Sequence, residues 1–272
     1  MLIGISGRIG SGKDTVGKII QYLVWKSRVE RGELPLSVYS FSDFARETYF
    51  GKNQSNFEIK KFADKLKDFV CLLIGCTREQ LEDQDFKEKE LGPEWDRIIS
   101  SDGKIYLPDD YPDLEYSKLT PRELLQIIGT ECIRDKVHPN AWVNALFADY
   151  KYEIHRSEVP TRAAGFIDQH VYPNWIITDM RFPNELEAVK SRGGITIRVN
   201  RPKPPCGDVQ FNGTQEEWKE LVKRNKEQNA KFNHPSETAL DNAEFDYIIE
   251  NNSSIEDLIH TVSLILKKEK II

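Results

Sequence analysis

Glycines and a lysine follow the first apolar run of the chain in a pattern that suits phosphate binding. The run Leu2–Ser6 (LIGIS) leads into Gly7–Lys13 (GRIGSGK), which fits the Walker A pattern G-x-x-x-x-G-K between an expected strand and an expected helix. Glycines let the backbone wrap around phosphate oxygens, and the N–H groups that open a helix supply positive potential. A plain glycine-rich turn is the alternative, and the strand–loop–helix context argues against it. The expected phosphate contacts are Gly7, Gly10, Ser11, Gly12 and Lys13.

The residue after this lysine departs from the usual form of such loops, where Ser or Thr serves a magnesium ion. Asp14 stands there, and Thr15 follows it. A carboxylate beside a triphosphate is repelled unless a cation lies between them. Two interpretations stay open: Asp14 holds Mg²⁺ directly or through a water, or it turns away and Thr15 serves. The expected cofactors are therefore ATP and Mg²⁺.

A second group of chemically active residues follows the buried run Trp175–Asp179. Asp179 lies where a magnesium-bound water or an acceptor hydroxyl could be held, and Arg181 lies where its guanidinium could grip a phosphate. A surface ion pair between these two side chains is the structural alternative. With Lys13, they are the expected catalytic residues, and Asp14, Thr15 and Asp179 are the candidate metal ligands. A segment of about 40 residues rich in Lys and Arg precedes the last strand, as a lid over the phosphates would.

Short apolar runs alternate with helical segments along the chain, which predicts an α/β fold with a parallel sheet. The binding crevice would then lie at the carboxyl ends of the strands. The expected strands are Leu2–Ser6, Phe57–Phe62, Trp175–Asp179, Ile195–Val199 and Asp246–Glu250. The expected helices are Lys13 to about Arg31, Ala63–Ile74, Leu119–Asp135, Pro139 to about Tyr150, Pro183–Arg192, Thr214–Lys231 and Ser254–Lys268.

Three segments have no clear assignment. Leu34–Asn56 has helical character and could form a flap, Asp83–Ser117 is acidic and rich in turns, and Lys151–Asn174 is expected to be a mobile loop. The helix from Leu119 should open with Thr120 as its N-cap and Glu123 as the capping-box partner.

Length and composition narrow the class of protein. The chain has 272 residues and a net charge of −6, which argues against broad nucleic-acid binding. No signal peptide or membrane helix is expected, so we predict a cytoplasmic protein of a bacterial or phage-infected cell. The four cysteines contain no CxxC pair and are expected to be reduced. A disulfide between Cys71 and Cys76 is not expected if both lie on or near one helix.

Several blocks in order resemble the phage-type deoxynucleoside monophosphate kinases, which are P-loop nucleoside monophosphate kinases. The loop of that family often reads GKDT, as Gly12–Thr15 do here, so Asp14 fits the family. The other similar blocks are FADKLKD (62–68), PRELLQIIGTE (121–131) followed by AW (141–142), TDMRFPNELEAV (178–189), GGITIRVNRP (193–202) and HPSE (234–237). The extra material at 34–56 and 151–174 departs from the family pattern.

The resemblance implies a fold and a set of roles. It implies one three-layer P-loop kinase domain over residues 1–272, with a five-stranded parallel sheet, an acceptor-binding insertion at about 63–150 and a lid-like segment at about 201–240. Lys67, Arg122 and Arg181 would hold the acceptor phosphate, while Arg8 and Arg201 would face the donor phosphates. Gln126 could bind a base or sugar or lie on a helix surface, and Trp142 could stack on the base or fill the core. His234 would shape a turn before Pro235 or bind Glu237.

The function that follows is ATP-dependent phosphorylation of deoxynucleoside monophosphates to diphosphates, which is deoxynucleotide metabolism. The expected partners are small nucleotides, with no nucleic acid and no membrane, and a homodimer stays open. One alternative is a P-loop kinase for another phosphorylated acceptor, such as dephospho-coenzyme A or phosphomevalonate. Another is a nucleotide-binding module without catalysis. The accepted bases and the exclusion of ribonucleotides do not follow from the sequence.

Overall fold

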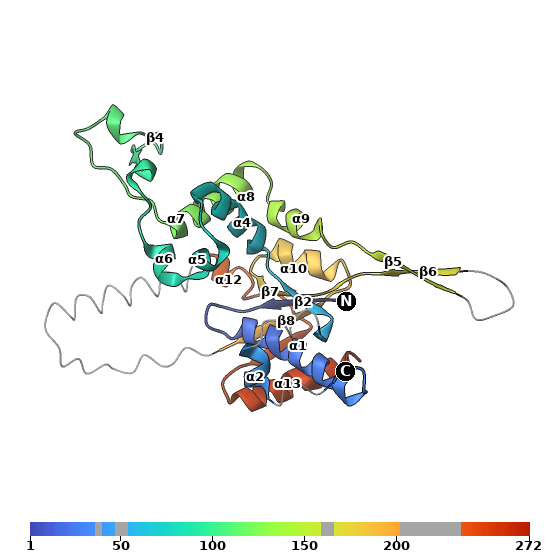
Figure 1. The fold of residues 1–272 in the computed structure, drawn as a ribbon. Helices are drawn as coiled ribbons and strands as arrows, with labels where there is room; N and C mark the ends of the chain where they lie inside the picture. Colours follow the sequence, from blue (N-terminus) through green and yellow to red (C-terminus); the bar gives the residue numbers. More distant parts are fainter. Residues whose placement is uncertain (36–39, 47–53, 159–165, 202–234) are drawn as a thin grey trace, which may run out of the picture. The chain divides into compact units, whose positions relative to one another are not determined.

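The computed structural model describes residues 1–35, 40–46, 54–158, 166–201 and 235–272. The chain divides into two compact units (Figure 1). The first unit comprises Met1–Lys61 and Ala148–Ile272, and the second comprises Phe62–Phe147. Each unit is described by itself below. The second has nearly the extent of the segment expected to be an acceptor-binding insertion, whose role stays a prediction.

A five-stranded sheet forms the centre of the first unit, and every pair of neighbouring strands is parallel. The order across the sheet is β2-β7-β1-β8-β9. The strands are β1 (Leu2–Ser6), β2 (Phe57–Lys60), β7 (Asn174–Met180), β8 (Ile195–Asn200) and β9 (Tyr247–Glu250). The predicted α/β class and the five predicted strands are confirmed, with ends that differ by one or two residues. Because β1 lies centrally, the loop after it opens at the middle of the carboxyl edge.

Helices cover both faces of this sheet, which gives three layers (Figure 1). On one face, α1 (Lys13–Glu30) packs beside α13 (Ile255–Lys268), and their apolar residues form one buried cluster with Ile3 and Ile5 of β1. On the other face, α10 (Pro183–Lys190) contacts β1 and β8. It approaches so closely that a Cβ on Gly4 would lie 3.1 Å from Val189 Cγ1. A short helix, α2 (Phe41–Arg46), agrees with the helical character expected there.

The second unit is mostly helical. Its apolar core includes Val70 and Leu81, together with Leu119, Leu124 and Ile128. Its helices are α4 (Ala63–Ile74), α5 (Arg78–Glu82), α6 (Gln84–Glu88), α7 (Pro121–Gln126), α8 (Ile133–Lys136) and α9 (Ala141–Phe147), with the π-helical segment η3 (Ile127–Cys132). Its shorter elements are η1 (Pro93–Trp95), β3 (Ile98–Ile99), β4 (Ile105–Tyr106) and η2 (Pro108–Asp110).

The helix predicted for Leu119–Asp135 has the predicted start and a different interior. The capping box between Thr120 and Glu123 is confirmed, with both reciprocal hydrogen bonds present. The chain then passes from α7 through the wider π-helical turns of η3 into α8. Inserted turns of this kind shift the register of a helix, and the apolar spacing along the sequence does not reveal them.

The expectation of a mobile loop at Lys151–Asn174 is wrong for the described part of that segment. Strands β5 (Glu153–Glu158) and β6 (Phe166–Val171) form an antiparallel pair in which Glu153 faces Val171. Polar residues interrupt both runs, so they give no apolar face that predicts a strand. Antiparallel pairing nevertheless satisfies their backbone groups. The predicted helix Thr214–Lys231 and His234 lie outside the described residues, and α12 (Pro235–Thr238) follows them. No described helix is both long and apolar enough to cross a membrane.

The central strands should carry much of the stability of the first unit. Ile176 of β7 is fully buried, whereas Ile248 of β9 is 62% exposed. We expect Ile176→Ala to lower the free energy of unfolding by about 2–5 kcal/mol because it removes buried methylenes and leaves a cavity. The matched change Ile248→Ala should cost less than about 1 kcal/mol. Urea unfolding followed by circular dichroism measures both, and equal losses would contradict the assignment of β7 to the core.

Candidate functional site

The loop between β1 and α1 has the shape of an anion cradle. Gly10 and Gly12 adopt positive φ angles of 76° and 93°, and Gly12 is the N-cap of the 18-residue helix α1. A Cβ on Gly12 would lie 2.5 Å from Asn251 Nδ2, which donates to the carbonyl oxygen of Ser11 at 2.8 Å. Ser11 Oγ is buried, and among the described residues it has no hydrogen-bond partner. Backbone amides, a helix N-terminus and this hydroxyl together fit the phosphates of a nucleotide.

Lys13 is held in the cradle as a largely desolvated cation. Its residue is only 8% exposed. Burial lowers the pKa of Lys13, as does the like charge of Arg181, while Asp14, Glu237 and Asp179 oppose that shift. Two cations this close, with limited access to water, favour an anionic ligand between or beside them. Arg181 and Asp179, both predicted as catalytic, therefore lie within electrostatic reach of Lys13.

Asp14 is neutralised by a residue that the sequence did not single out. Lys61, just beyond β2, places its Nζ 2.9 Å from Asp14 Oδ1, and Thr178 Oγ1 donates to the same oxygen at 2.9 Å. Partial burial would raise the pKa of Asp14, but the hydrogen bond and charge of Lys61, the Thr178 bond and the charge of Lys13 together lower it. The cation beside this carboxylate is therefore a lysine, and both interpretations of Asp14 toward magnesium stay predictions. Thr15, the other candidate metal ligand, is half-buried in the first turn of α1.

A carboxylate from the other end of the chain meets the phosphate loop. Glu237 of α12 is buried, and its Oε2 accepts a hydrogen bond from the Ile9 backbone N–H at 2.6 Å. Its Oε1 pairs with the Arg181 guanidinium. The Arg181 backbone N–H donates in turn to Glu185 of α10 at 2.7 Å. A loop amide and an arginine thus converge on one anionic group. Arg181 therefore has Glu237 as an ion-pair partner, and the surface ion pair considered between Asp179 and Arg181 stays a prediction.

A second carboxylate links Arg8 to the edge of the sheet. Asp241 pairs through Oδ2 with Arg8 and through Oδ1 with Arg198 at 2.6 Å. Arg198 lies within β8, where its buried guanidinium also donates to Ser6 Oγ at 3.0 Å. Two acidic side chains that follow residue 235 therefore hold adjacent residues of the loop, Asp241 at Arg8 and Glu237 at Ile9. Arg201, predicted to face donor phosphates, is exposed immediately after β8.

Of the predicted acceptor-binding residues, Arg181 belongs to the first unit, and the others lie in the second. Lys67 of α4 pairs with Glu82 at 2.6 Å. Arg122 of α7 pairs with Glu88 at 2.5 Å and donates to Gln84 Oε1 at 2.7 Å. Both cations reach the short helices α5 and α6, so the structure brings them to the same side of this unit.

A third cation belongs to this group. The pKa of Lys87 on α6 is lowered by partial burial and by the nearby charges of Arg122 and Lys67. Gln126 is exposed on α7, as a base-binding or a surface glutamine would be. The half-buried Trp142 donates its indole N–H to the carbonyl oxygen of Gly129 in η3 at 2.9 Å. The indole N–H of Trp142 is therefore used within the protein. Its ring could still stack on a base or fill the core, as predicted.

Comparisons with known proteins bear on the kind of site this is. No family model matches the chain. The chain is 29% identical over 216 residues to the deoxynucleoside-5′-monophosphate kinase of Escherichia phage T5, a match that covers 70% of this chain and 72% of the relative. It is 24% identical over 164 residues to a protein of Acanthamoeba polyphaga mimivirus that is provisionally named a deoxynucleotide monophosphate kinase, covering 59% of this chain and 69% of that relative.

The chain resembles deoxynucleotide monophosphate kinases. The sequence blocks predicted this resemblance, and the two relatives, one from a phage and one from a virus, confirm it. The five-stranded parallel sheet with helices on both faces agrees with the P-loop kinase fold implied by that resemblance. The roles of single residues in such a kinase stay predictions.

Several residues of the site were missed by sequence reasoning. They are Lys61, Thr178, Arg198, Glu237, Asp241 and Asn251. Some carried a usable signal: Arg198 is a charge inside an otherwise apolar strand, and Asn251 directly follows the last strand. Glu237 ends the block HPSE, where it was named only as a partner for His234 and not as a partner of the loop. Lys61 and Asp241 carried none, because their partners lie far along the chain.

The bridge made by Glu237 should matter for stability before any ligand binds. Glu237→Ala removes the partner of the Ile9 amide and of Arg181, and we expect it to lower the free energy of unfolding by about 1–3 kcal/mol. Glu244, an exposed glutamate in the next turn region, is the matched control, and Glu244→Ala should change stability by less than about 0.5 kcal/mol. Urea unfolding of both variants measures the difference. Equal stability of the two would mean that the bridge is not formed in solution.

Proposed function

We propose that this protein catalyses ATP-dependent phosphorylation of deoxynucleoside monophosphates to diphosphates. The observation that carries the proposal is the phosphate loop itself, with Lys13 buried in it and Arg181 beside it, in a chain that resembles deoxynucleotide monophosphate kinases. Glu237 adds support, since the Ile9 amide and Arg181 that it joins are donors suited equally to a phosphate oxygen.

The donor nucleotide would bind along the loop. The amides of Gly7–Lys13, the Ser11 hydroxyl and Lys13 would hold the phosphates of ATP, with Arg8 and Arg201 near the outer phosphate. Thr15 or Asp14 would hold a magnesium ion bound with ATP, which would offset the charge of the phosphates. Lys13 and Arg181 would stabilise the charge on the transferring phosphoryl group, and Asp179 would hold a metal-bound water.

The acceptor would bind through the cations of the second unit. Lys67 and Arg122 each hold a glutamate, and an acceptor phosphate can take the place of such a carboxylate. Lys87 would add a third positive charge. Gln126 and the ring of Trp142 are the candidates for base and sugar contacts. Transfer between phosphates needs no strong base because the acceptor phosphate is already nucleophilic, so positioning and electrostatics would supply most of the rate.

Two other functions are to be distinguished from this one. A kinase for dephospho-coenzyme A or phosphomevalonate would share the loop and the sheet, and a binding module would share the loop alone. Thermal-shift measurements with ATP, dGMP, dTMP, dephospho-coenzyme A and phosphomevalonate separate the three. Stabilisation by ATP and by a deoxynucleoside monophosphate supports the proposal, whereas stabilisation by ATP alone supports the binding module. A cytosolic location, a homodimer and the lack of nucleic-acid binding stay predictions.

The decisive test is turnover. Folded protein with ATP and Mg²⁺ should convert at least one deoxynucleoside monophosphate to its diphosphate in a coupled assay. Lys13→Ala should lower kcat/KM by about 10²–10³-fold, since it removes a preorganised charge from the site. Lys18, exposed on the same helix, is the control, and Lys18→Ala should keep wild-type rates. Failure of the wild-type protein to turn over any of the deoxynucleoside monophosphates would refute the proposed function.

The metal ligand at the loop can be assigned by substitution. Because Lys61 and Thr178 already engage Asp14, we favour Thr15 as the side chain that serves magnesium. Asp14→Asn should then leave the Mg²⁺ concentration for half-maximal rate within about twofold, while Thr15→Val should raise it about tenfold, a loss of about 1.4 kcal/mol. Titration of activity with MgCl₂ measures both. If Asp14→Asn raised the Mg²⁺ concentration for half-maximal rate more than Thr15→Val did, Asp14 would be the metal ligand instead.

A further inference from the structure

Two cysteines meet at the carboxyl end of α4. Cys71 lies in the last turn of this helix, and Cys76 lies just beyond Gly75, whose φ of 69° turns the chain back. The Cys76 backbone N–H donates to the Cys71 carbonyl oxygen at 3.1 Å, which closes the helix end. In helix ends closed this way, the side chains at these two positions normally make an apolar contact. Here they are thiols, and the Cys76 thiol hydrogen-bonds to Cys71 Sγ with 3.8 Å between the sulfurs.

We propose that Cys71 and Cys76 form a redox modification site, in which a small-molecule disulfide such as glutathione disulfide converts the two thiols into an intramolecular disulfide. A disulfide was not expected from the sequence if both cysteines lie on or near one helix, and Cys76 does lie just beyond α4. The turn at Gly75 nevertheless brings the two sulfurs within 3.8 Å of each other, which makes a bond between them feasible. The sulfurs must move from 3.8 Å to the bond length of about 2.05 Å, while the backbone hydrogen bond keeps the two residues close together.

The exchange proceeds in two steps that balance. The thiolate of one cysteine attacks a sulfur of glutathione disulfide, forms a mixed disulfide and releases one glutathione thiolate. The thiolate of the other cysteine then attacks the protein sulfur of that mixed disulfide, forms the internal bond and releases the second glutathione thiolate. Two protein thiols are oxidised, one glutathione disulfide is reduced, and the two protons pass to the released glutathione.

The environment of Cys71 favours Cys76 as the thiol that attacks first. Burial, then the hydrogen bond and charge of Cys76, raise the pKa of Cys71 to about 11, and the charge of Asp68 adds to this while that of Arg78 opposes it. Arg78 is engaged by carboxylates of α4, with Asp64 at 3.0 Å and Asp68 at 3.1 Å. Cys71 therefore stays protonated near neutral pH. Cys76 is the first nucleophile, and Cys71 resolves the mixed disulfide.

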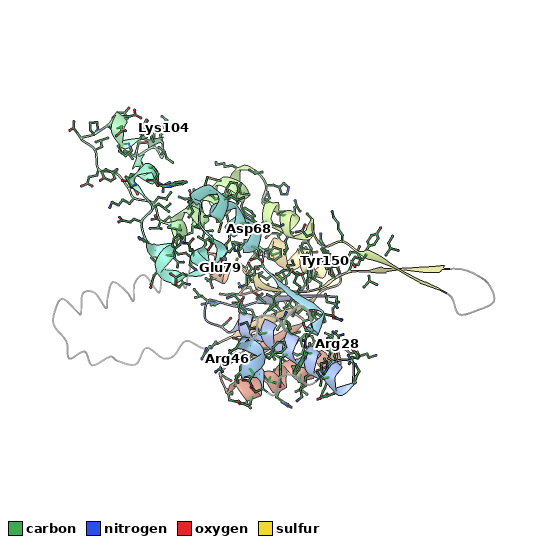
Figure 2. All side chains as sticks on the ribbon, viewed as in Figure 1. Arg28, Arg46, Asp68, Glu79, Lys104 and Tyr150 are labelled. Atoms are coloured by element: carbon green, nitrogen blue, oxygen red, sulfur yellow. The ribbon has the colours of Figure 1, made fainter. Side chains whose placement is uncertain are left out.

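The disulfide would tie α4 to the start of α5. In Figure 2, Asp68 lies on α4 and Glu79 on α5, the two elements on either side of the pair. Arg78 and Lys67 both contact Glu82 at the end of α5, so an S–S bond would fix the turn that sets these contacts. This inference stands on the helix end alone and does not depend on the proposed kinase activity.

Peptide mapping of the whole protein tests the inference. Both cysteines lie in one tryptic peptide, Asp68–Arg78. After incubation with glutathione disulfide at neutral pH and alkylation of the remaining thiols, this peptide should be two hydrogen atoms lighter than its reduced form and carry no alkyl group. Dithiothreitol should restore two alkylatable thiols. Cys132 is exposed and serves as the unpaired control, which should carry glutathione instead.

Single substitutions test the order of attack. The Cys71→Ser variant should accumulate a stable glutathione adduct on Cys76. In the Cys76→Ser variant, the adduct on Cys71 should form at least tenfold more slowly. Two separate glutathione adducts on the wild-type peptide would overturn the proposal. The proposal would also be overturned if Cys71 and Cys76 both stayed fully alkylatable after Cys132 had reacted with glutathione disulfide. A disulfide that joins Cys132 to Cys71 or to Cys76 would overturn it as well. The wild-type mapping needs no variant, so it stands even if a substitution impairs folding.

Discussion

The parallel pairing of β1 with β7 and β8 is the constraint on which the candidate site depends. Parallel strands place all their carboxyl ends at one edge of the sheet, so segments distant in sequence open beside one another. The phosphate loop follows β1, Asp179 and Arg181 close β7, and Asn251 follows β9. The hydrogen bond from Asn251 to the carbonyl of Ser11 spans 240 positions along the chain and exists because of this arrangement. Shifting one of these strands would therefore displace the groups that hold the loop.

Features with a local cause could be predicted from the sequence. The five strands are apolar runs that need no knowledge of their partners, and the Thr120 capping box and the Gly75 helix end are set by neighbouring residues. The hairpin of β5 and β6 could not be predicted, because its polar residues mark no buried face. Within the site, the loop and its lysine were evident. The contact of Ile9 with Glu237 was not, because it joins residues 228 positions apart.

Charge compensation is the common feature of both units. Asp14 is matched by Lys61, Arg181 by Glu237, Lys67 by Glu82 and Arg122 by Glu88. Charges with limited access to water are costly to leave alone, and these pairs offset them without a ligand. If the cations bind phosphate as proposed, the carboxylates are the groups that a ligand must displace. An incoming phosphate would therefore exchange with a carboxylate and gain only the difference between the two interactions. Such exchange favours reversible binding over very tight binding.

The contact between Glu237 and the Ile9 amide has a thermodynamic consequence. If a phosphate oxygen and Glu237 compete for that amide, each must weaken the binding of the other by the same factor. The affinity of the loop for an anion is then an adjustable quantity, set jointly by the loop and by a glutamate encoded more than two hundred residues later.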